Sequence, residues 1–170
     1  MTETQTLTKL IVLYMLDKVG YPITKAQIME FILEKEYSNY FTLTQAIFEL
    51  TEDGFIKSDL THSATFLSLT DKGRDTLTFF AGRIYDGIRE DINRYFEENS
   101  IEIANNMSVI TNYYKTAKGD YVADLSAREK SEDLINIRIN MPTEDSARAM
   151  CEHWRDRSSD IYSFILENLL

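Results

Sequence analysis

The chain has 170 residues, of which 44% are hydrophobic and 27% are charged, and its formal net charge is −10. This composition argues against a disordered chain, and the longest apolar run, Leu10 to Leu16, is far short of the ~20 residues that a transmembrane helix needs. Residues 1–70 hold 5 basic and 9 acidic side chains and residues 71–170 hold 13 and 19, so neither half shows the basic excess typical of nucleic-acid-binding domains.

The N-terminus and the cysteine content indicate the compartment. The first residues, MTETQTLTK, lack a basic segment followed by an apolar core, so we expect no secretory signal. The single cysteine, Cys151, cannot form a disulfide within the chain, which is typical of proteins in a reducing environment. We therefore expect a cytoplasmic protein.

Two helices are expected in the first 35 residues. The segment from Leu7 to Val19, ended by Gly20, is too hydrophobic for a surface helix and should be buried on more than one side. Thr24 and Gln27 have the spacing of a capping box, in which each side chain bonds the backbone N–H of the other residue. This box predicts a second helix that runs to about Lys35.

A third helix is predicted by the pair Thr42 and Gln45, which has the same capping-box spacing. Its apolar residues recur at intervals of three and four positions: Leu43, Ile47 and Leu50. Gly54 should end this helix in the left-handed conformation.

After Gly54 the apolar period changes from that of a helix to that of a strand. The runs FIKSD at 55–59 and TFLSL at 65–69 predict two strands joined by the turn LTHSA, which together form a hairpin. Thr70 should then cap a long helix that continues to about Asn99. Three helices and a hairpin in this order predict a winged helix-turn-helix domain over residues 1–73, followed by a connecting helix over 74–99.

The connecting helix carries an apolar stripe with charged residues beside it. The stripe consists of Leu77, Ala81, Ile84, Ile88, Ile92 and Tyr95. We expect the stripe to join two protomers, because two-fold DNA sites require two-fold symmetric proteins. The alternative is that it packs against the C-terminal helix of the same chain.

Residues 100–170 predict an α+β domain with a three-stranded antiparallel sheet. The strand-like runs are MSVITNYYKT, DYVADLSA and DLINIRIN, and the glycine of AKG allows a turn between the first two. The third run alternates isoleucine with polar residues, which predicts one buried and one solvated face. A terminal helix should follow Thr143, and one of its faces carries Ala147, Met150, Cys151, Trp154, Ser158, Ile161 and Ile165.

These segments resemble two groups of proteins. Leu50 and the stretch GFI at 54–56, followed by LSLTDKG at 67–73, resemble winged-helix regulators of the MarR and PadR type. Over nearly the whole chain, LTKLIVLYMLDKVGYPIT, NYFTLTQAIFEL, IREDI and EHWRDRSSDIY resemble a Gram-positive bacterial family of unknown function. That resemblance implies a winged helix joined to an α+β half and, by analogy, a dimeric transcriptional regulator.

In a winged helix, the start of the third helix reads the major groove and the hairpin contacts the backbone or the minor groove. The candidate DNA-binding residues are therefore Lys25, Thr42, Thr44, Gln45, Lys57, Thr61, His62 and Ser63. Threonine and glutamine bond base edges. Against DNA, the third helix carries Glu49 and no lysine or arginine, although phosphate contacts come chiefly from basic side chains.

Because of this charge balance, the binding partner of the third helix could be double-stranded DNA or another protein. A protein would dock on exposed aromatic residues, of which Tyr40 and Phe48 are the candidates. Phe48 falls outside the apolar face formed by Leu43, Ile47 and Leu50. The alternative is that these residues, together with Tyr37 and Phe41, pack between helices.

A small-molecule effector is a further expectation for the second half. Its aromatic residues and one cation could line a pocket for an anionic or aromatic ligand: Tyr113, Tyr114, Tyr121, Trp154 and Arg138. Ordinary core packing of the aromatic residues is the alternative.

The sequence offers little for catalysis. Cys151 and His153 lie two positions apart on a helix and point about 200° apart, so they cannot form a nucleophile–base pair. With two histidines and one cysteine the chain has no zinc-binding spacing, and its glycines form no phosphate-binding loop. We expect no enzyme activity, no cofactor and no metal.

Overall fold

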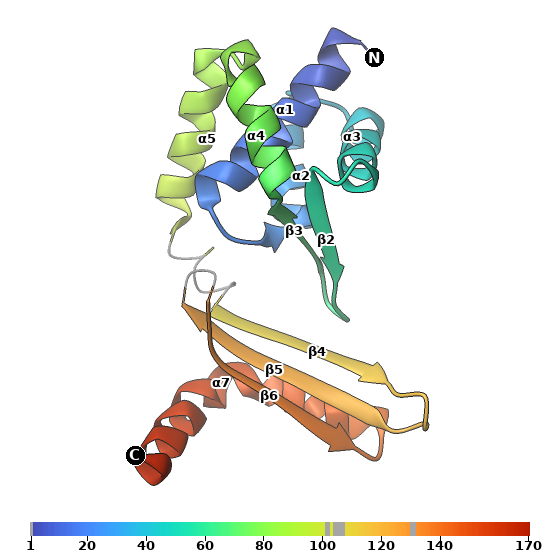
Figure 1. The fold of residues 1–170 in the computed structure, drawn as a ribbon, viewed down its shortest axis with the longest axis vertical. Coiled ribbons are helices and arrows are strands. Elements are labelled where there is room, and N and C mark those ends of the chain that lie inside the picture. Colours follow the sequence, from blue (N-terminus) through green and yellow to red (C-terminus); the bar gives the residue numbers. More distant parts are fainter. Residues whose placement is uncertain (1, 101–102, 104–107, 130–131) are drawn as a thin grey trace. The chain divides into compact units, whose positions relative to one another are not determined.

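The computed structural model describes residues 2–100, 103, 108–129 and 132–170. Within these ranges the chain is an α+β protein with two three-stranded antiparallel sheets (Figure 1). It divides into two compact units, one of Met1–Leu60 with Ala64–Ile103, the other of Thr61–Ser63 with Ala104–Leu170. No helix in the described ranges is long and apolar enough to cross a membrane.

The first unit is built around α1 (Glu3–Val19). This helix begins before the predicted start at Leu7, because Thr2 at its N-cap forms a capping box at the N-terminal end. Ile11, Val12 and Met15 are fully buried although they point in different directions around the helix. The prediction that this segment is buried on more than one side is therefore confirmed.

The helix α2 (Lys25–Glu34) begins as predicted. Thr24 Oγ1 accepts a hydrogen bond from the Gln27 N–H at 3.1 Å, and Gln27 Oε1 accepts one from the Thr24 N–H at 3.0 Å. The reciprocal bonds confirm the capping box.

The helix α3 (Tyr40–Glu52) begins earlier than predicted, so the capping box of Thr42 with Gln45 is wrong. Asn39 is the N-cap, and its Oδ1 accepts from the Thr42 N–H at 2.9 Å. Asparagine caps a helix at least as well as threonine, so the earlier start adds helical hydrogen bonds without losing the cap. Gly54, with a φ of +73°, follows the helix in the left-handed conformation, as predicted.

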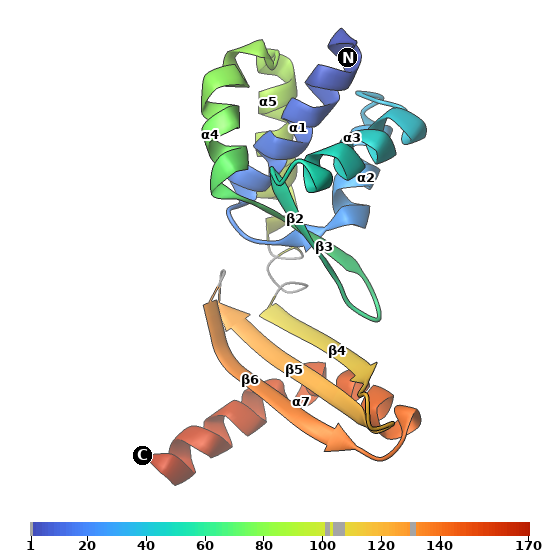
Figure 2. The ribbon, with the colours of Figure 1, turned by 45° about the vertical axis from the view of Figure 1, so that its right-hand side comes forward.

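A small sheet completes this part of the fold. It contains β1 (Ile23–Thr24), β2 (Ile56–Leu60) and β3 (Thr65–Leu69) in the order β1-β3-β2, with both pairs antiparallel. The predicted hairpin of β2 and β3 is confirmed, and in Figure 2 it extends away from the helices. Ile23 and Leu67 lie opposite each other and are fully buried, so β1 ties the start of α2 to the hairpin.

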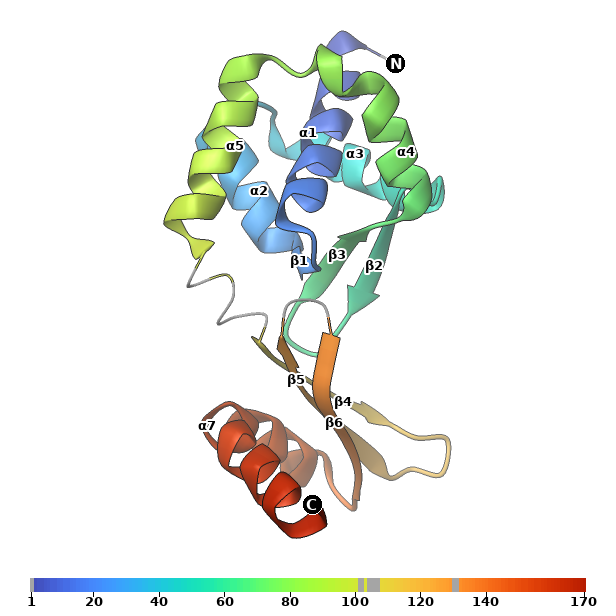
Figure 3. The ribbon, with the colours of Figure 1, turned by 60° about the vertical axis from the view of Figure 1, so that its left-hand side comes forward.

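The predicted continuous helix over residues 71–99 is wrong. The chain forms α4 (Asp71–Phe80), a 3₁₀ turn η1 (Ala81–Arg83) and α5 (Asp86–Glu98). Both α4 and α5 contact α1, and Figure 3 shows them on different sides of it. A straight helix could not bury both segments against α1, and this burial outweighs the helical hydrogen bonds that the break removes.

One arginine stabilises the break. The Arg89 guanidinium donates to the carbonyl oxygens of Ala81 and Ile84, each at 2.9 Å. The Ala81 carbonyl oxygen also accepts from the Ile84 N–H at 3.1 Å, so the arginine adds a side-chain donor where the helical hydrogen-bond ladder is interrupted.

The second unit contains the predicted antiparallel sheet. Its strands β4 (Val109–Lys115), β5 (Tyr121–Glu129) and β6 (Glu132–Met141) lie in the order β4-β5-β6. Gly119 takes a φ of +92° in the turn between β4 and β5. Met107, in the first predicted run, lies outside the described residues. The isoleucines of β6 are half-buried and the polar residues between them are exposed, which confirms the predicted alternation.

The helix α7 (Glu144–Leu169) begins after its N-cap Thr143 and covers one face of this sheet (Figure 1). The core between them consists of Ala123, Leu125, Ala147, Cys151 and Trp154. Ser158 is the last buried residue of the helix, Ile161 still packs against the core, and the C-terminal end of α7 extends past the sheet.

Candidate functional site

The helix α3 presents two contrasting faces. Its buried side carries the predicted Leu43, Ile47 and Leu50, together with Ala46. Its outer surface is aromatic, because Tyr40, Phe41 and Phe48 are 57%, 81% and 58% exposed. The alternative, that these residues and Tyr37 pack between helices, is therefore wrong for these three, whereas Tyr37 is half-buried. A surface of this kind makes contacts through apolar area rather than charge.

The central acidic residue of α3 is neutralised within the fold. Lys9 Nζ of α1 lies 2.6 Å from Glu49 Oε2, and Gln45 Nε2 donates to Glu49 Oε1 at 2.7 Å. The hydrogen bonds from Lys9 and Gln45 hold the pKa of the Glu49 carboxyl below its ordinary value. Lys9 thus offsets the charge of Glu49, although α3 has no basic side chain of its own.

The two threonines predicted to touch bases are less accessible than expected. Thr42 is half-buried at the third position of α3, and Thr44 is half-buried one turn before Phe48. The Oγ1 of Thr44 is buried and has no hydrogen-bond partner in the described part of the chain. Gln45 is exposed, so its side chain is the most accessible of the three.

The basic residues predicted to contact DNA lie outside α3. Lys25 is half-buried at the first position of α2. Lys57 is exposed on β2, but its Nζ lies 3.1 Å from a carboxylate oxygen of Asp59 on the same strand. An exposed pair of this kind is weak and can exchange for another anion.

Two further cations near the end of α3 bind groups of the chain itself. Lys72 Nζ donates to the Asp53 carbonyl oxygen at 2.6 Å and lies 4.4 Å from the centre of the Phe55 ring. Arg74 lies 3.1 Å from a carboxylate oxygen of Asp17. These contacts stabilise the junction of α3, the hairpin and α4, and they reduce the positive charge available to a ligand.

The remaining candidates lie in the turn between β2 and β3. His62 and Ser63 are exposed and Thr61 is half-buried. The Ser63 N–H donates to Thr61 Oγ1 at 3.4 Å, a weak bond within the turn. These three turn residues are grouped with the second compact unit, whereas α3 lies in the first.

The predicted dimer stripe is part of the core of the first unit. Leu77, Ile84, Ile88 and Ile92 are buried within the single chain, and Ala81 and Tyr95 are half-buried. The Tyr95 ring lies 4.8 Å from the Phe31 ring of α2. The break at η1 directs these side chains inward, so the expectation that they form a free surface for a second protomer is wrong. A homodimer itself stays a prediction.

The aromatic residues of the second unit do not converge on one pocket. Trp154 is buried on the helix side of the sheet, where its Nε1 donates to the Ser126 carbonyl oxygen at 3.0 Å. Tyr113 and Tyr121 pack against the same core, whereas Tyr114 is exposed. Arg138 lies on the solvated side of β6, where its Nε donates to Asp124 at 3.1 Å. Three of the four aromatic residues are thus packed in the core, whereas Tyr114 and Arg138 face solvent.

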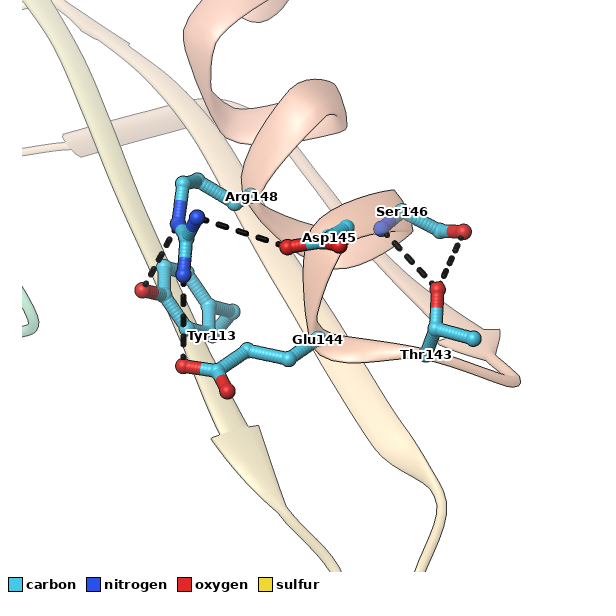
Figure 4. A network of polar contacts seen from close by, with 6 residues as sticks. All are labelled: Tyr113, Thr143, Glu144, Asp145, Ser146 and Arg148. Atoms are coloured by element: carbon cyan, nitrogen blue, oxygen red, sulfur yellow. Dashed lines mark hydrogen bonds and ion pairs between the residues drawn. The ribbon is translucent and has the colours of Figure 1, made fainter.

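A polar network fixes the start of α7 (Figure 4). Arg148 contacts Glu144 at 3.5 Å, Asp145 at 3.4 Å and the Tyr113 hydroxyl of β4 at 3.5 Å. The hydrogen bond with Tyr113 raises the pKa of the Arg148 guanidinium, so it stays charged. This network joins the first turn of α7 to the edge of the sheet.

Cys151 is a core residue. Its Sγ donates to the Asn112 carbonyl oxygen at 3.4 Å, and burial raises the pKa of the thiol. A protonated, buried thiol is a poor nucleophile. His153 lies exposed on the same helix. Over the described residues, no group of three histidine, cysteine or acidic side chains is arranged to hold a metal ion.

One surface of the second unit was not predicted from the sequence. A groove of about 380 Å³ lies between the sheet and α7, with a lining that includes Leu125, Ile137, Met150 and Ile161. The signal was present in the sequence, because the apolar stripe of the terminal helix continues past the residues that the sheet can cover.

Comparison with protein families identifies the family to which the chain belongs. The model of the family described as Domain of unknown function (DUF4364) matches residues 8–169, which covers both units. Comparison with curated proteins and with solved structures found no match. The match spans nearly the whole chain, and the protein therefore belongs to the DUF4364 family.

Proposed function

We propose that this protein is a transcriptional regulator that binds double-stranded DNA as a dimer, through a winged helix-turn-helix formed by α1, α2, α3 and the β2–β3 hairpin. The observation that carries the proposal is the order of elements. A short strand between the first two helices pairs with the hairpin in the order β1-β3-β2, and α3 directly precedes that hairpin. This is the arrangement in which a second helix enters the major groove.

The charge distribution of α3 supports weak rather than tight binding. Lys9 neutralises Glu49, so the acidic residue at the centre of the helix does not repel phosphate as strongly as the sequence indicates. Gln45 is the reading residue, since its amide can bond the edge of adenine, and Phe41 and Phe48 can contact thymine methyl groups. Lys25 and Lys57 supply the phosphate contacts, with Lys57 exchanging Asp59 for phosphate.

Selection from a randomised duplex pool tests this proposal. The full chain is incubated with the pool at low and at physiological salt, and the retained duplexes are sequenced. A DNA reader enriches a two-fold-symmetric site and loses affinity steeply as salt rises. On that site, Gln45→Ala should weaken binding about tenfold, because a good side chain–base contact contributes roughly 1–3 kcal/mol. Thr78→Ala, an exposed threonine on α4, is the matched control and should bind like the wild type.

The second candidate function keeps the fold and makes α3 a docking surface for another protein. It is favoured by the exposure of Tyr40, Phe41 and Phe48, since aromatic residues are enriched at the centres of interfaces. Hydrophobic docking through Phe48 should depend little on salt. Two results together would replace the first proposal by the second. The chain would retain no duplex even at low salt, and it would bind a protein that the Phe48→Ala variant no longer binds.

A response to a small effector stays a prediction. The residues predicted for it are placed in the core or on opposite faces of the sheet, so they supply no site. An enriched duplex whose release depends on an added metabolite would be the direct evidence.

A further inference from the structure

The apolar face of α7 continues beyond the sheet that covers its first half. Met150, Arg157, Ile161 and Phe164 are spaced by seven, four and three positions, so they lie on one side of the helix. Met150 and Ile161 pack against the core, but Phe164 is 64% exposed. An unpaired aromatic residue on the projecting end of an ordered helix is a surface that association would bury.

A concave apolar surface lies on the same side of this helix. The groove between β6 and α7 is lined by Leu125, Ile137, Ile139, Met150, Trp154 and Ile161. Its volume of about 380 Å³ is sufficient for one or two large side chains. The polar residues among those that line it are His153 and Arg157 of α7.

We infer that the occupant of this groove is the α7 helix of a second copy of the chain. The two helices lie antiparallel about a two-fold axis near Ile161, and Phe164 of each protomer enters the groove of the other. A two-fold interface requires one patch to carry both complementary surfaces. The concave groove and the projecting Phe164 meet this requirement, because both belong to the same side of one helix.

The charges around the patch are also complementary. Arg157 stands at the groove, whereas Asp160 and Glu167 flank Phe164 on the projecting end of the helix. In an antiparallel pair, Arg157 of each protomer faces the segment of the partner that contains Glu167. The contact of Arg157 with Asp160 in its own chain is 3.9 Å long and its side chain is 71% exposed, so the arginine is available to a second copy.

This interface extends the proposed function, which calls for a two-fold symmetric protein, and it replaces the stripe over residues 77–95 as the contact. It is tested without DNA, so failure of the dimer and failure of DNA binding are separate results.

Sedimentation equilibrium of the full chain measures the association. The wild type should form dimers, and Phe164→Asp should raise the dimer dissociation constant about 100-fold or more, because the substitution removes a buried phenylalanine from both copies. Phe79→Asp is the matched control: Phe79 is 84% exposed on α4 in the first unit, and its replacement should leave association unchanged. Far-UV circular dichroism should show all three chains folded. A wild type that stays monomeric, or a dimer insensitive to Phe164→Asp, overturns the inference.

A charge exchange tests the orientation. Arg157→Glu and Glu167→Arg should each weaken the dimer about tenfold, and the double variant should recover most of the loss, because it restores opposite charges across the interface. A double variant no tighter than the single ones overturns the antiparallel arrangement. A monomeric chain that instead takes up a small apolar molecule in the groove would overturn the second copy as its occupant.

Discussion

The segment 77–95 and the helix α7 have similar sequence patterns and opposite roles in the fold. Each carries apolar residues at intervals of three and four positions with charged residues beside them. The first segment breaks at η1, and its halves bury their apolar side chains within the first unit. The second stays a single helix of 26 residues and extends past its sheet, so the end of its stripe is exposed. The spacing of apolar residues thus predicts which side of a helix is buried but not what buries it.

The largest expected effect tests the claim that segment 77–95 is core. Ile92 is fully buried on α5, and Ile92→Asp places a carboxylate among apolar side chains. We expect a loss of about 4 kcal/mol or more in the free energy of unfolding, measured with urea. Phe79→Asp should change it by less than about 0.5 kcal/mol, since Phe79 is exposed. An Ile92→Asp chain that stays fully stable as a monomer would show that the stripe is a surface after all.

The first half of α7 should be nearly as sensitive. Trp154 is buried, and its indole N–H donates to the Ser126 carbonyl oxygen. Trp154→Ala should cost about 3–5 kcal/mol in unfolding free energy, because it leaves a cavity. Trp154→Phe keeps an aromatic ring but removes the hydrogen bond to the Ser126 carbonyl oxygen, and should cost about 1–3 kcal/mol. Equal losses for the two variants would contradict a contribution from the hydrogen bond.

A smaller effect depends on pH and tests how α5 is held in the first unit. The Tyr37 hydroxyl donates to Asp91 of α5, and burial, together with that carboxylate, raises the pKa of Tyr37 to about 12. The stabilisation is complete below the unfolded pKa of 10.0 and is lost as pH rises toward 12. The urea midpoint of Tyr37→Phe should therefore lie below that of the wild type near neutral pH. This decrease in the midpoint should be smaller than the decrease caused by Trp154→Ala.

Measurements of the urea midpoint at alkaline pH provide the control for this prediction. Tyr37→Phe has no phenol to ionise, so the difference between the two midpoints should shrink above pH 10.0. The hydrogen bond from Tyr37 also lowers the pKa of the Asp91 carboxyl, so its contribution is present above the ordinary carboxyl pKa and is lost as pH falls through the lowered value. A constant difference at all pH values would mean that Tyr37 acts through packing alone.

The smallest expected effect lies at the end of α7. Leu169 is 80% exposed, so Leu169→Ala should change the unfolding free energy by less than about 0.5 kcal/mol when the chain is dilute enough to be monomeric. A large loss in the dilute monomer would show that the projecting end of α7 packs within its own chain.

The sequence by itself determined the local elements of this protein. The capping box of Thr24 with Gln27, the left-handed Gly54 and the period-two runs of the hairpin all depend on residues close in the chain. These elements are stabilised by local hydrogen bonds and backbone sterics, which can be predicted from neighbouring residues in the sequence. The same reasoning failed at Thr42, because a second residue three positions earlier could also cap α3, and Asn39 starts the longer helix.

Only the tertiary structure decided which surfaces are free. The exposure of Phe48, the neutralisation of Glu49 by Lys9 and the burial of Ile92 all depend on residues far apart in the chain. An apolar or charged side chain looks the same in the sequence whether its partner is in the same chain, in another molecule or in water. The packing of α1 against the segments on either side of the break settles that choice for the first unit. The length of α7 relative to its sheet settles it for the second.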